Sequence, residues 1–383
     1  MSLRSDVVVV GAGAAGCAAA LRLRRQGVAT LVVERDLDTP ERFCGEFLSG
    51  EAEATLAALG VREVIAALDP APVRRMGLYG GGRCFGMPLS AGGFGLTRLA
   101  LDGALLAAAR DAGAEVAAGL AVDEIEGNAE RGFRLRARDR SGTTVFIEAA
   151  AVIGAWGKRA APDRTLGRRF LQRPSPWVGV KVRFQETAPS DEVALFVFPG
   201  GHCGLVDVEG RRATWAALAR SSRLRAVGGR PERLVEFARR NNPALEERLR
   251  GGRLIESAFQ TVGAVPLQRK EPTAGGVLLA GDAAGLTAPF LGLGVANALR
   301  TGCEAADAAT AWLQGRLSPA AAERAYRDWW RRHVAPVQSW SYAASALLGE
   351  PAAAAAGLWA LRHFPALAEA LYRRSRARLP SAA

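Results

Sequence analysis

The feature that most constrains the fold is a glycine-rich turn directly after a short apolar run near the N-terminus. Val7–Val10 is β-branched and apolar on both faces, which is typical of a strand in a parallel sheet covered on both sides. The turn reads Gly11-x-Gly13-x-x-Gly16, and a helix is predicted from Ala14 to Gln26. In such a turn the first glycine permits the tight bend, the second lets a pyrophosphate approach the backbone, and the third lets helix and strand pack closely.

The next predicted strand, Val28–Val33, ends in an acid. A carboxylate at Glu34 can accept hydrogen bonds from both ribose hydroxyls of an adenosine. The pyrophosphate would sit on the helix N-terminus, where unpaired N–H groups and the helix dipole favour an anion. Strand, turn, helix, strand and acid in this order predict an adenine-dinucleotide site. Its candidate residues are Gly11, Gly13, Ala14, Ala15, Gly16, Glu34 and Arg35.

Length and composition are those of a globular protein. The chain has 383 residues, of which 49% are apolar, enough for two domains or one elaborated one. No stretch reaches the roughly 18 to 20 consecutive apolar residues of a membrane span, and the first strand begins too early to leave room for a signal peptide. We therefore expect a cytoplasmic protein. The five cysteines are odd in number and form no CxxC pair, so we expect neither disulfides nor a metal site.

The formal net charge of +12 comes almost entirely from arginine. Only Lys158, Lys181 and Lys270 are lysines, a bias typical of the coding sequence rather than of function. Long-range attraction to an acidic substrate, a carrier protein or an anionic membrane surface stays open. Nucleic-acid binding is not expected, because the arginines are spread along the chain without an aromatic-interleaved basic module.

The pattern along the chain indicates an α/β fold with a second sheet inserted into it. Residues 1–70, 95–170 and 270–315 predict a Rossmann-like domain with a parallel sheet, and residues 71–94 and 171–269 predict an antiparallel sheet that serves as the substrate domain. Residues 316–383 predict a helical region. Within the first domain, an alternating strand is predicted at Thr143–Glu148 and a separate buried strand at Ala149–Gly154.

A second glycine site follows the predicted strand at residues 276–280. Asp282, in the turn after this strand, can accept a hydrogen bond from a ribityl hydroxyl, and Gly292-Leu293-Gly294 can present helix N–H groups to a flavin ring. A nicotinamide dehydrogenase would need only the first glycine site, so the pair of sites indicates FAD. A long helix is predicted from Pro289 to about Gly315. The further cofactor-binding candidates are Arg98, Val122, Gly281, Asp282, Pro289, Gly292, Gly294 and Val295.

These motifs resemble the FAD-dependent group that contains p-hydroxybenzoate hydroxylase, and within it the geranylgeranyl reductase branch. The two glycine sites and the pair Arg98 and Asp102 carry the resemblance to the group, and Cys44-Gly45-Glu46 carries the resemblance to the branch. The resemblance implies bound FAD and a loop around Cys44 near the flavin face. It also implies transient docking of NAD(P)H, because the chain has no second nucleotide-binding βαβ unit.

The chain departs from the group's pattern in two places. Hydroxylases of the group usually carry an Asp-Gly pair where this chain has Ala155-Trp156-Gly157. Flavin halogenases resemble the group as well, but they need a catalytic lysine and a Trp-rich motif. With three lysines and no WxWxIP sequence, halogenation is disfavoured.

The catalytic candidates are Cys44, Glu46 and His202. The resemblance makes Cys44 a proton donor over the flavin, with inert packing as the alternative, and Glu46 an acid near the ring. His202 lies in a glycine-flanked strand start, where a ligand can approach closely, and histidine titrates near neutrality. Two further sets keep two interpretations each. Trp156, Trp177 and Trp215 are core or an aromatic pocket wall, and the tail Leu361–Leu379 caps the domain or lies on a membrane, with capping favoured.

Taken together, the sequence predicts an FAD-dependent oxidoreductase that uses NAD(P)H or a reduced carrier. Reduction of a C=C bond in an apolar small molecule, isoprenoid or polyketide-like, is the favoured reaction. The alternatives are an NAD(P)H-dependent flavin monooxygenase and a non-catalytic flavin-binding protein. The sequence carries no indication of the substrate's identity or of the oligomeric state.

Overall fold

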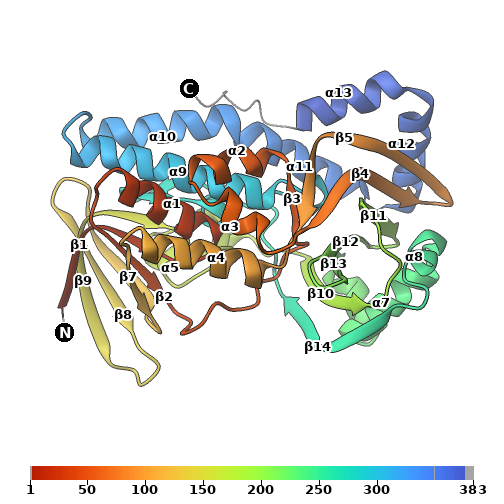
Figure 1. The fold of residues 1–383 in the computed structure, drawn as a ribbon, viewed down its shortest axis with the longest axis horizontal. Coiled ribbons are helices and arrows are strands. Elements are labelled where there is room, and N and C mark those ends of the chain that lie inside the picture. The colour runs from red at the N-terminus through yellow and green to blue at the C-terminus, as the bar shows by residue number, and fades with distance from the viewer. Residues whose placement is uncertain (1, 349, 376–383) are drawn as a thin grey trace.

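Residues 2–348 and 350–375, which the computed structural model describes, form two eight-stranded sheets joined by helices (Figure 1). The first sheet has the order β15-β16-β9-β1-β2-β6, and β7 and β8 extend it through β9. Its strands are β1 (Ser2–Val10), β2 (Thr30–Glu34), β6 (Glu115–Ala118), β7 (Ala121–Asn128), β8 (Gly132–Arg138), β9 (Thr144–Gly154), β15 (Thr273–Ala274) and β16 (Val277–Leu279). β1 runs parallel to both β2 and β9, as expected for the buried run Val7–Val10.

One strand of this sheet differs from its prediction. The segments Thr143–Glu148 and Ala149–Gly154 were predicted as two strands, but they form the single strand β9. Its first half pairs with β8 and has one partly exposed face, whereas residues 151–154 are buried throughout. Along this one continuous strand, the first half is buried on one face and the second half on both faces. The hydrophobic pattern changes at that point, and in the sequence this change looks like the boundary between two strands.

The second sheet has the order β14-β10-β13-β12-β11-β4-β5-β3. Its strands are β3 (Phe47–Ser49), β4 (Ala71–Gly80), β5 (Arg83–Gly95), β10 (Trp177–Gln185), β11 (Glu192–Phe198), β12 (Gly201–Val208), β13 (Arg212–Arg220) and β14 (Arg253–Val262). Its pairs are antiparallel apart from the parallel pair β4 and β11. The strand β3 comes from the range that the sequence division assigned to the first domain, so the chain enters the second sheet earlier than predicted.

The core of the first part lies where two helices meet at unusually close range. α1 (Ala14–Arg25) presents a face of buried alanines to α9 (Gly294–Leu313). A Cβ on Gly302 of α9 would lie 2.2 Å from the carbonyl oxygen of Ala15, so only glycine permits this contact. α9 begins at Gly294 instead of Pro289, because Pro289–Leu291 is a 3-10 turn, η3, and Gly292 adopts the left-handed conformation with φ of 66°.

The remaining helices cover the edges and the second sheet. α10 (Pro319–His333) packs along α9, and α12 (Pro351–His363) packs on β4 and β5 at the other end of the molecule, where α13 (Pro365–Ser375) follows it (Figure 1). The others are α2 (Glu51–Ala58), α3 (Arg62–Ala66), α4 (Arg98–Asp111), α5 (Pro162–Thr165), α6 (Ser221–Ala226), α7 (Pro231–Arg240), α8 (Pro243–Arg248) and α11 (Ala335–Leu348). None of the helices in the described ranges has the length and hydropathy of a membrane-spanning segment.

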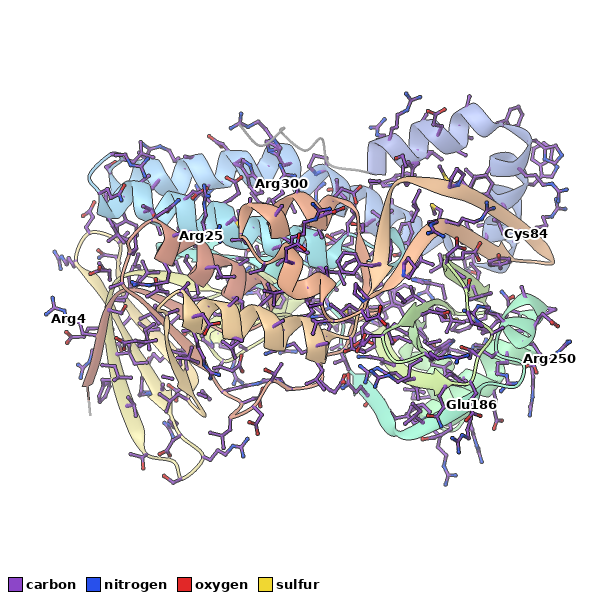
Figure 2. The ribbon with its side chains drawn as sticks, in the orientation of Figure 1. Arg4, Arg25, Cys84, Glu186, Arg250 and Arg300 are labelled. Carbon is purple, nitrogen blue, oxygen red and sulfur yellow. The ribbon has the colours of Figure 1, made fainter. Side chains whose placement is uncertain are left out.

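The C-terminal tail has both exposed and buried apolar side chains. The predicted segment Leu361–Leu379 lies within the described residues only as far as Ser375, and there Phe364 and Leu367 are exposed while the preceding Leu358 is buried against the second sheet. Arg4, Arg25 and Arg250 are exposed at widely separated places (Figure 2). These three exposed positive charges therefore do not form a single basic patch.

Candidate functional site

The turns that follow three parallel strands open at the same edge of the first sheet. Val10, Gly154 and Leu279 are in register at the carboxyl ends of β1, β9 and β16. Ligands of open α/β sheets bind at this edge. The two glycine sites, far apart in the sequence, meet here as well, because a Cβ on Gly281 would lie 2.9 Å from the Cβ of Ala15.

The three glycines of the first turn have different surroundings. Gly11 has a left-handed φ of 107°, and a Cβ there would lie 2.5 Å from the carbonyl oxygen of Ala155. A Cβ on Gly16 would lie 1.8 Å from the oxygen of Gly11. A Cβ on Gly13 would meet its nearest atom, Nη2 of Arg98, at an ordinary 3.6 Å. The fold itself requires the first and third glycines, whereas a Cβ on Gly13 would meet only two arginine side chains at ordinary contact distances.

Glu34 lies against this turn. Its side chain is buried at 7% exposure, and Oε2 accepts hydrogen bonds from the backbone N–H of Ala12 at 2.7 Å and from Nη2 of Arg42 at 3.1 Å. Arg35 and Val122 have different surroundings. The side chain of Arg35 is 67% exposed and pairs with Asp36, and Val122 is buried in the apolar cluster of the first sheet.

Two arginines and one buried acid complete the anion site. Arg98, the first residue of α4, donates from Nε and Nη2 to both oxygens of Asp102 at 3.0 and 2.7 Å. Arg42 Nε lies 3.1 Å from the same carboxylate and 3.7 Å from the position of a Cβ on Gly13. Burial works against the charge on Arg98, but Asp102 outweighs it and raises the pKa of the guanidinium. Two fixed guanidinium groups beside an anion-binding turn suit a pyrophosphate.

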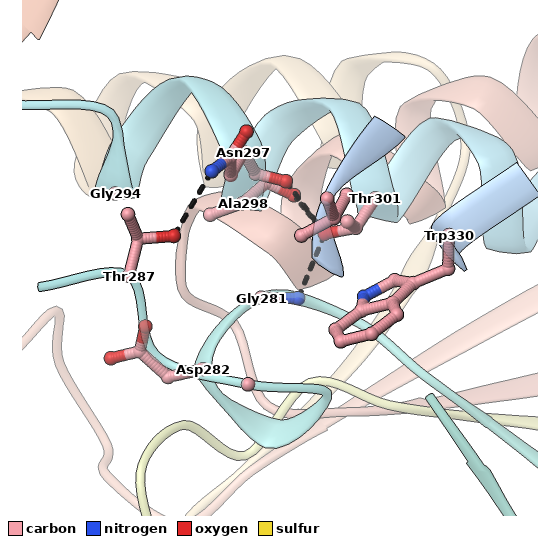
Figure 3. Close-up of a pocket in the computed structure, with 10 residues that line it drawn as sticks. Gly281, Asp282, Thr287, Gly294, Asn297, Ala298, Thr301 and Trp330 are labelled. Atoms are coloured by element: carbon pink, nitrogen blue, oxygen red, sulfur yellow. Dashed lines mark hydrogen bonds between the residues drawn. The ribbon is translucent and has the colours of Figure 1, made fainter. Parts of the chain in front are cut away.

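The second glycine site forms a narrow pocket under the start of α9 (Figure 3). The backbone N–H of Gly281 donates to Thr301 at 2.8 Å, and the side-chain amide of Asn297 donates to Thr287 at 3.0 Å. Figure 3 shows Asp282 and Thr287 on the loop that faces the first turns of α9. A Cβ on Gly294 would meet nothing within 4 Å, so a planar ring can approach the helix N-terminus here.

Both helix N-termini fit the two ends of FAD. α1 and α9 each begin without a side-chain cap and without an acidic residue in the first turn. Their first N–H groups are thus available to an anion at α1 and to the electron-rich edge of a flavin at α9. The residues that would hold the cofactor are the glycine turn, Glu34, Arg42 and Arg98 at one end, and Asp282 with the start of α9 at the other.

The comparison with known families agrees with this geometry. The family described as "FAD binding domain" matches residues 4–328. The chain belongs to the FAD-binding-domain family. The protein is therefore an FAD-dependent oxidoreductase, and the predictions of FAD and of a Rossmann-like fold are confirmed.

Two archaeal relatives cover most of the chain. The digeranylgeranylglycerophospholipid reductase of Methanosphaerula palustris is 26% identical over 350 residues, which is 86% of this chain and 82% of the relative. That of Methanosarcina mazei is 27% identical over 366 residues, 87% of this chain and 82% of the relative. A squalene epoxidase of Aspergillus fumigatus is 40% identical over 70 residues, so the match spans 18% of this chain and only 15% of that protein.

Solved structures share the fold over nearly the whole length. A geranylgeranyl bacteriochlorophyll reductase-like protein from Thermoplasma acidophilum has a TM-score of 0.77 at 20% identity, covering 98% of this chain and 100% of its own. A flavin-dependent brominase has a TM-score of 0.80 at 18% identity, covering 97% and 93%. These structural matches show the fold, and the two digeranylgeranylglycerophospholipid reductases confirm the predicted resemblance to the geranylgeranyl reductase branch.

The three catalytic candidates fall into two places. Cys44 is partly exposed, lies close enough to Arg98 to interact with it, and accepts a hydrogen bond from the backbone N–H of Glu46 at 3.3 Å. Glu46 is fully buried among cationic donors. His202, on β12, is 1% exposed, neither ring nitrogen has a partner within the described part of the chain, and burial lowers its pKa to about 4. Its ring meets that of Phe290 edge-on, with centroids 6.3 Å apart.

The three tryptophans lie in apolar clusters. Trp215 is fully buried in the core of the second sheet, and Trp177 is buried near it. Trp156 packs against the cluster of the first sheet, and its Nε1 donates to Asp163 at 3.3 Å. The core interpretation therefore fits all three.

Several lysines and arginines of the site were missed from the sequence. Lys158 Nζ lies 3.4 Å from Asp282 and donates to the carbonyl of Phe43 at 3.3 Å. Lys270 Nζ donates to the carbonyl oxygens of Lys158 at 2.7 Å and Asp282 at 2.8 Å. The rarity of lysine in this arginine-rich chain could have pointed to these residues. A compact ammonium can donate hydrogen bonds in several directions at a position where a planar guanidinium does not fit.

Proposed function

We propose that the protein reduces a C=C bond of an apolar isoprenoid or polyketide-like substrate, with NAD(P)H or a reduced carrier as the electron donor. The observation that carries the proposal is similarity over 86% and 87% of the chain to two digeranylgeranylglycerophospholipid reductases. It is supported by the loop Cys44-Gly45-Glu46, which the structure holds beside Arg98 of the anion site.

The proposed reaction divides between cofactor and protein. Reduced FAD, when bound, supplies a hydride to one carbon of the double bond. The thiol of Cys44 gives a proton to the other carbon, and solvent restores that proton afterwards. The rings of His202 and Phe290 meet edge-on between β12 and the turn before α9, and in this proposal they border the region that takes the substrate. A neutral, buried imidazole suits an apolar substrate better than a charged one.

The test is product analysis with and without oxygen. FAD-loaded protein is incubated with NADPH, NADH or dithionite and with candidate polyprenyl and aromatic substrates, and the product mass is measured. The proposal expects a gain of two hydrogens under anaerobic conditions. The variant Cys44→Ala should reduce its flavin normally but form little product. Product formed only in air and carrying a new oxygen atom would overturn the reductase.

The second candidate is a monooxygenase or epoxidase. The 70-residue match to a squalene epoxidase favours it. It predicts that air is required and that labelled oxygen from O₂ enters the product. Flavin that no donor reduces, with or without candidate substrates, would instead support the non-catalytic flavin-binding protein.

A further inference from the structure

The segment Glu41–Glu46, here called the clasp, passes from one sheet to the other. β2 of the first sheet ends at Glu34, and β3 of the second sheet begins at Phe47. The clasp carries Arg42, which lies at the anion site, and Cys44, the proposed proton donor. Whatever fixes the clasp therefore fixes both side chains.

Cations of the second sheet hold the C-terminal end of the clasp. Lys181 and Arg183 are two residues apart on β10, so they share one face of the sheet, and Thr214 is the register partner of Arg183 on β13. Glu46 is fully buried and accepts hydrogen bonds from all three side chains. The distances are 2.6 Å from Lys181 Nζ, 2.8 Å from Arg183 Nη2 and 2.5 Å from Thr214 Oγ1.

The same cations hold the N-terminal end. Arg183 donates from both terminal nitrogens to Glu41, at 2.7 and 2.9 Å. Lys181 lies 3.2 Å from Glu41 and also donates to the carbonyl of Arg42 at 3.1 Å. Two buried bases thus meet two acids, which balances the charge in a place where an unpaired ion would be costly.

The clasp is bonded to the cofactor side at the same time. Oε1 of Glu46 accepts a hydrogen bond of 2.8 Å from the backbone N–H of Arg98, at the start of α4. Glu46 has a left-handed φ of 61°, a conformation that costs energy in a residue other than glycine and persists only where surrounding contacts impose it. Its two oxygens accept hydrogen bonds from five donor atoms of four residues, so these contacts fix the carboxylate in one position.

We propose that Glu41 and Glu46 are positioning residues, which Lys181 and Arg183 hold so that Arg42 and Cys44 stay at the flavin site. The second sheet then sets the geometry of the cofactor site through four charged side chains. This proposal gives Glu46 a positioning role in place of the acid role that the sequence suggested. The chemical role of Cys44 rests on the proposed function, but the clasp itself does not.

The test uses the FAD-loaded full-length protein and the variant Glu41→Gln. Glu41 is 31% exposed, so its loss opens one end of the clasp without unpairing the buried Glu46. Cys44 should then react with iodoacetamide about five-fold faster. This is the factor expected when the clasp loses about 1 kcal/mol of the free energy that holds it in place. Peptide mass spectrometry follows Cys44, with the exposed Cys84 in the same molecule as an internal reference.

The matched control is Glu246→Gln. Glu246 accepts two hydrogen bonds from Arg239 at 2.7 and 2.9 Å, the same distances as those from Arg183 to Glu41, but on the exposed surface of α7 and α8. This variant should leave the alkylation of Cys44 unchanged. An equal rate at Cys44 in wild type and Glu41→Gln would overturn the clasp, as would equal acceleration in both variants. The alkylation rate does not depend on turnover, so a failed reductase assay leaves this result intact.

Discussion

Glu34 and Ala12 are joined by a hydrogen bond of 2.7 Å from the backbone N–H of Ala12 to Oε2 of the carboxylate. The last residue of β2 thus reaches back to the turn that follows β1. The buried carboxylate is fixed at the edge where the parallel strands end, before any ligand arrives. A preorganised group loses little entropy on binding, so it contributes fully to affinity.

The first prediction concerns this acid. Glu34→Ala should weaken FAD binding about ten-fold or more, because a charge-assisted hydrogen bond to a ribose is lost and Arg42 loses one of its two partners. Quenching of FAD fluorescence during titration measures the dissociation constant. Glu115→Ala, at an exposed position of β6, is the control and should bind FAD normally. An unchanged affinity in Glu34→Ala would remove the ribose role.

Two glycines of one turn should fail in different ways. In Gly16→Ala the new methyl group overlaps the carbonyl oxygen of Gly11, so the protein should unfold at a clearly lower temperature even without FAD. In Gly13→Ala the methyl group meets only the side chains of Arg98 and Arg42, both at ordinary distances, so the apoprotein should keep its stability. FAD affinity should nevertheless fall, because the methyl group stands where the pyrophosphate approaches. Thermal unfolding of both apoproteins and FAD titration separate the two effects, and a destabilised Gly13→Ala apoprotein would contradict them.

Local pattern was enough to predict the nucleotide side of the site. The run Val7–Val10, the glycine turn and Glu34 all lie within the first 34 residues, and each is specified by neighbours a few residues away. The start of α4 is local in the same sense, because the hydroxyl of its N-cap residue, Thr97, accepts a hydrogen bond from the N–H of Ala100 three positions on. Local pattern gave a wrong prediction at β9. Burial changes from one face to both faces within this single strand, and the resulting change in hydrophobic pattern resembles a strand boundary.

The charged partners across the two sheets could not be predicted in this way. Glu46 and Arg183 are 137 positions apart in the sequence, and nothing near either residue indicates the other. A hydrophobic period reports which face of a strand is buried but not which side chain will meet it. For the same reason Arg42 looked like one arginine among many, although the fold places it between Glu34 and Asp102.

His202 should make stability depend on pH. Burial lowers its pKa to about 4 from an ordinary 6.5, and no neighbouring charge contributes. Between these two pH values the unfolded chain binds a proton at His202 that the folded protein does not bind. The contribution of His202 to the free energy of unfolding is therefore complete above pH 6.5 and is lost as the pH falls toward 4. The full loss is about 3 kcal/mol. Urea unfolding of wild type and His202→Leu across this range measures it as the difference between the two curves. Parallel curves would show that the imidazole titrates normally in the fold.

Lys270 is the last test, because it ties together the loops after β9 and β16. Its Nζ donates to the carbonyl oxygens of Lys158 and Asp282 and lies 4.2 Å from the ring centroid of Phe170. Lys270→Met removes both hydrogen bonds in a buried place and should lower the free energy of unfolding by about 2 to 4 kcal/mol. Lys270→Arg should restore little of it, since a planar guanidinium is larger than the ammonium it replaces.

The same variants should also change the cofactor site. When the loop that carries Asp282 is released, FAD should dissociate faster from Lys270→Met than from wild type at a temperature where both are folded. Stopped-flow dilution to a concentration well below the dissociation constant, followed by the return of FAD fluorescence, measures that rate. Arg269→Met, at the exposed neighbouring position, is the matched control, because Arg269 bonds only the surface Ser339 within the described residues. Full stability in Lys270→Arg would mean that charge alone, and not the shape of the ammonium, is what this position requires.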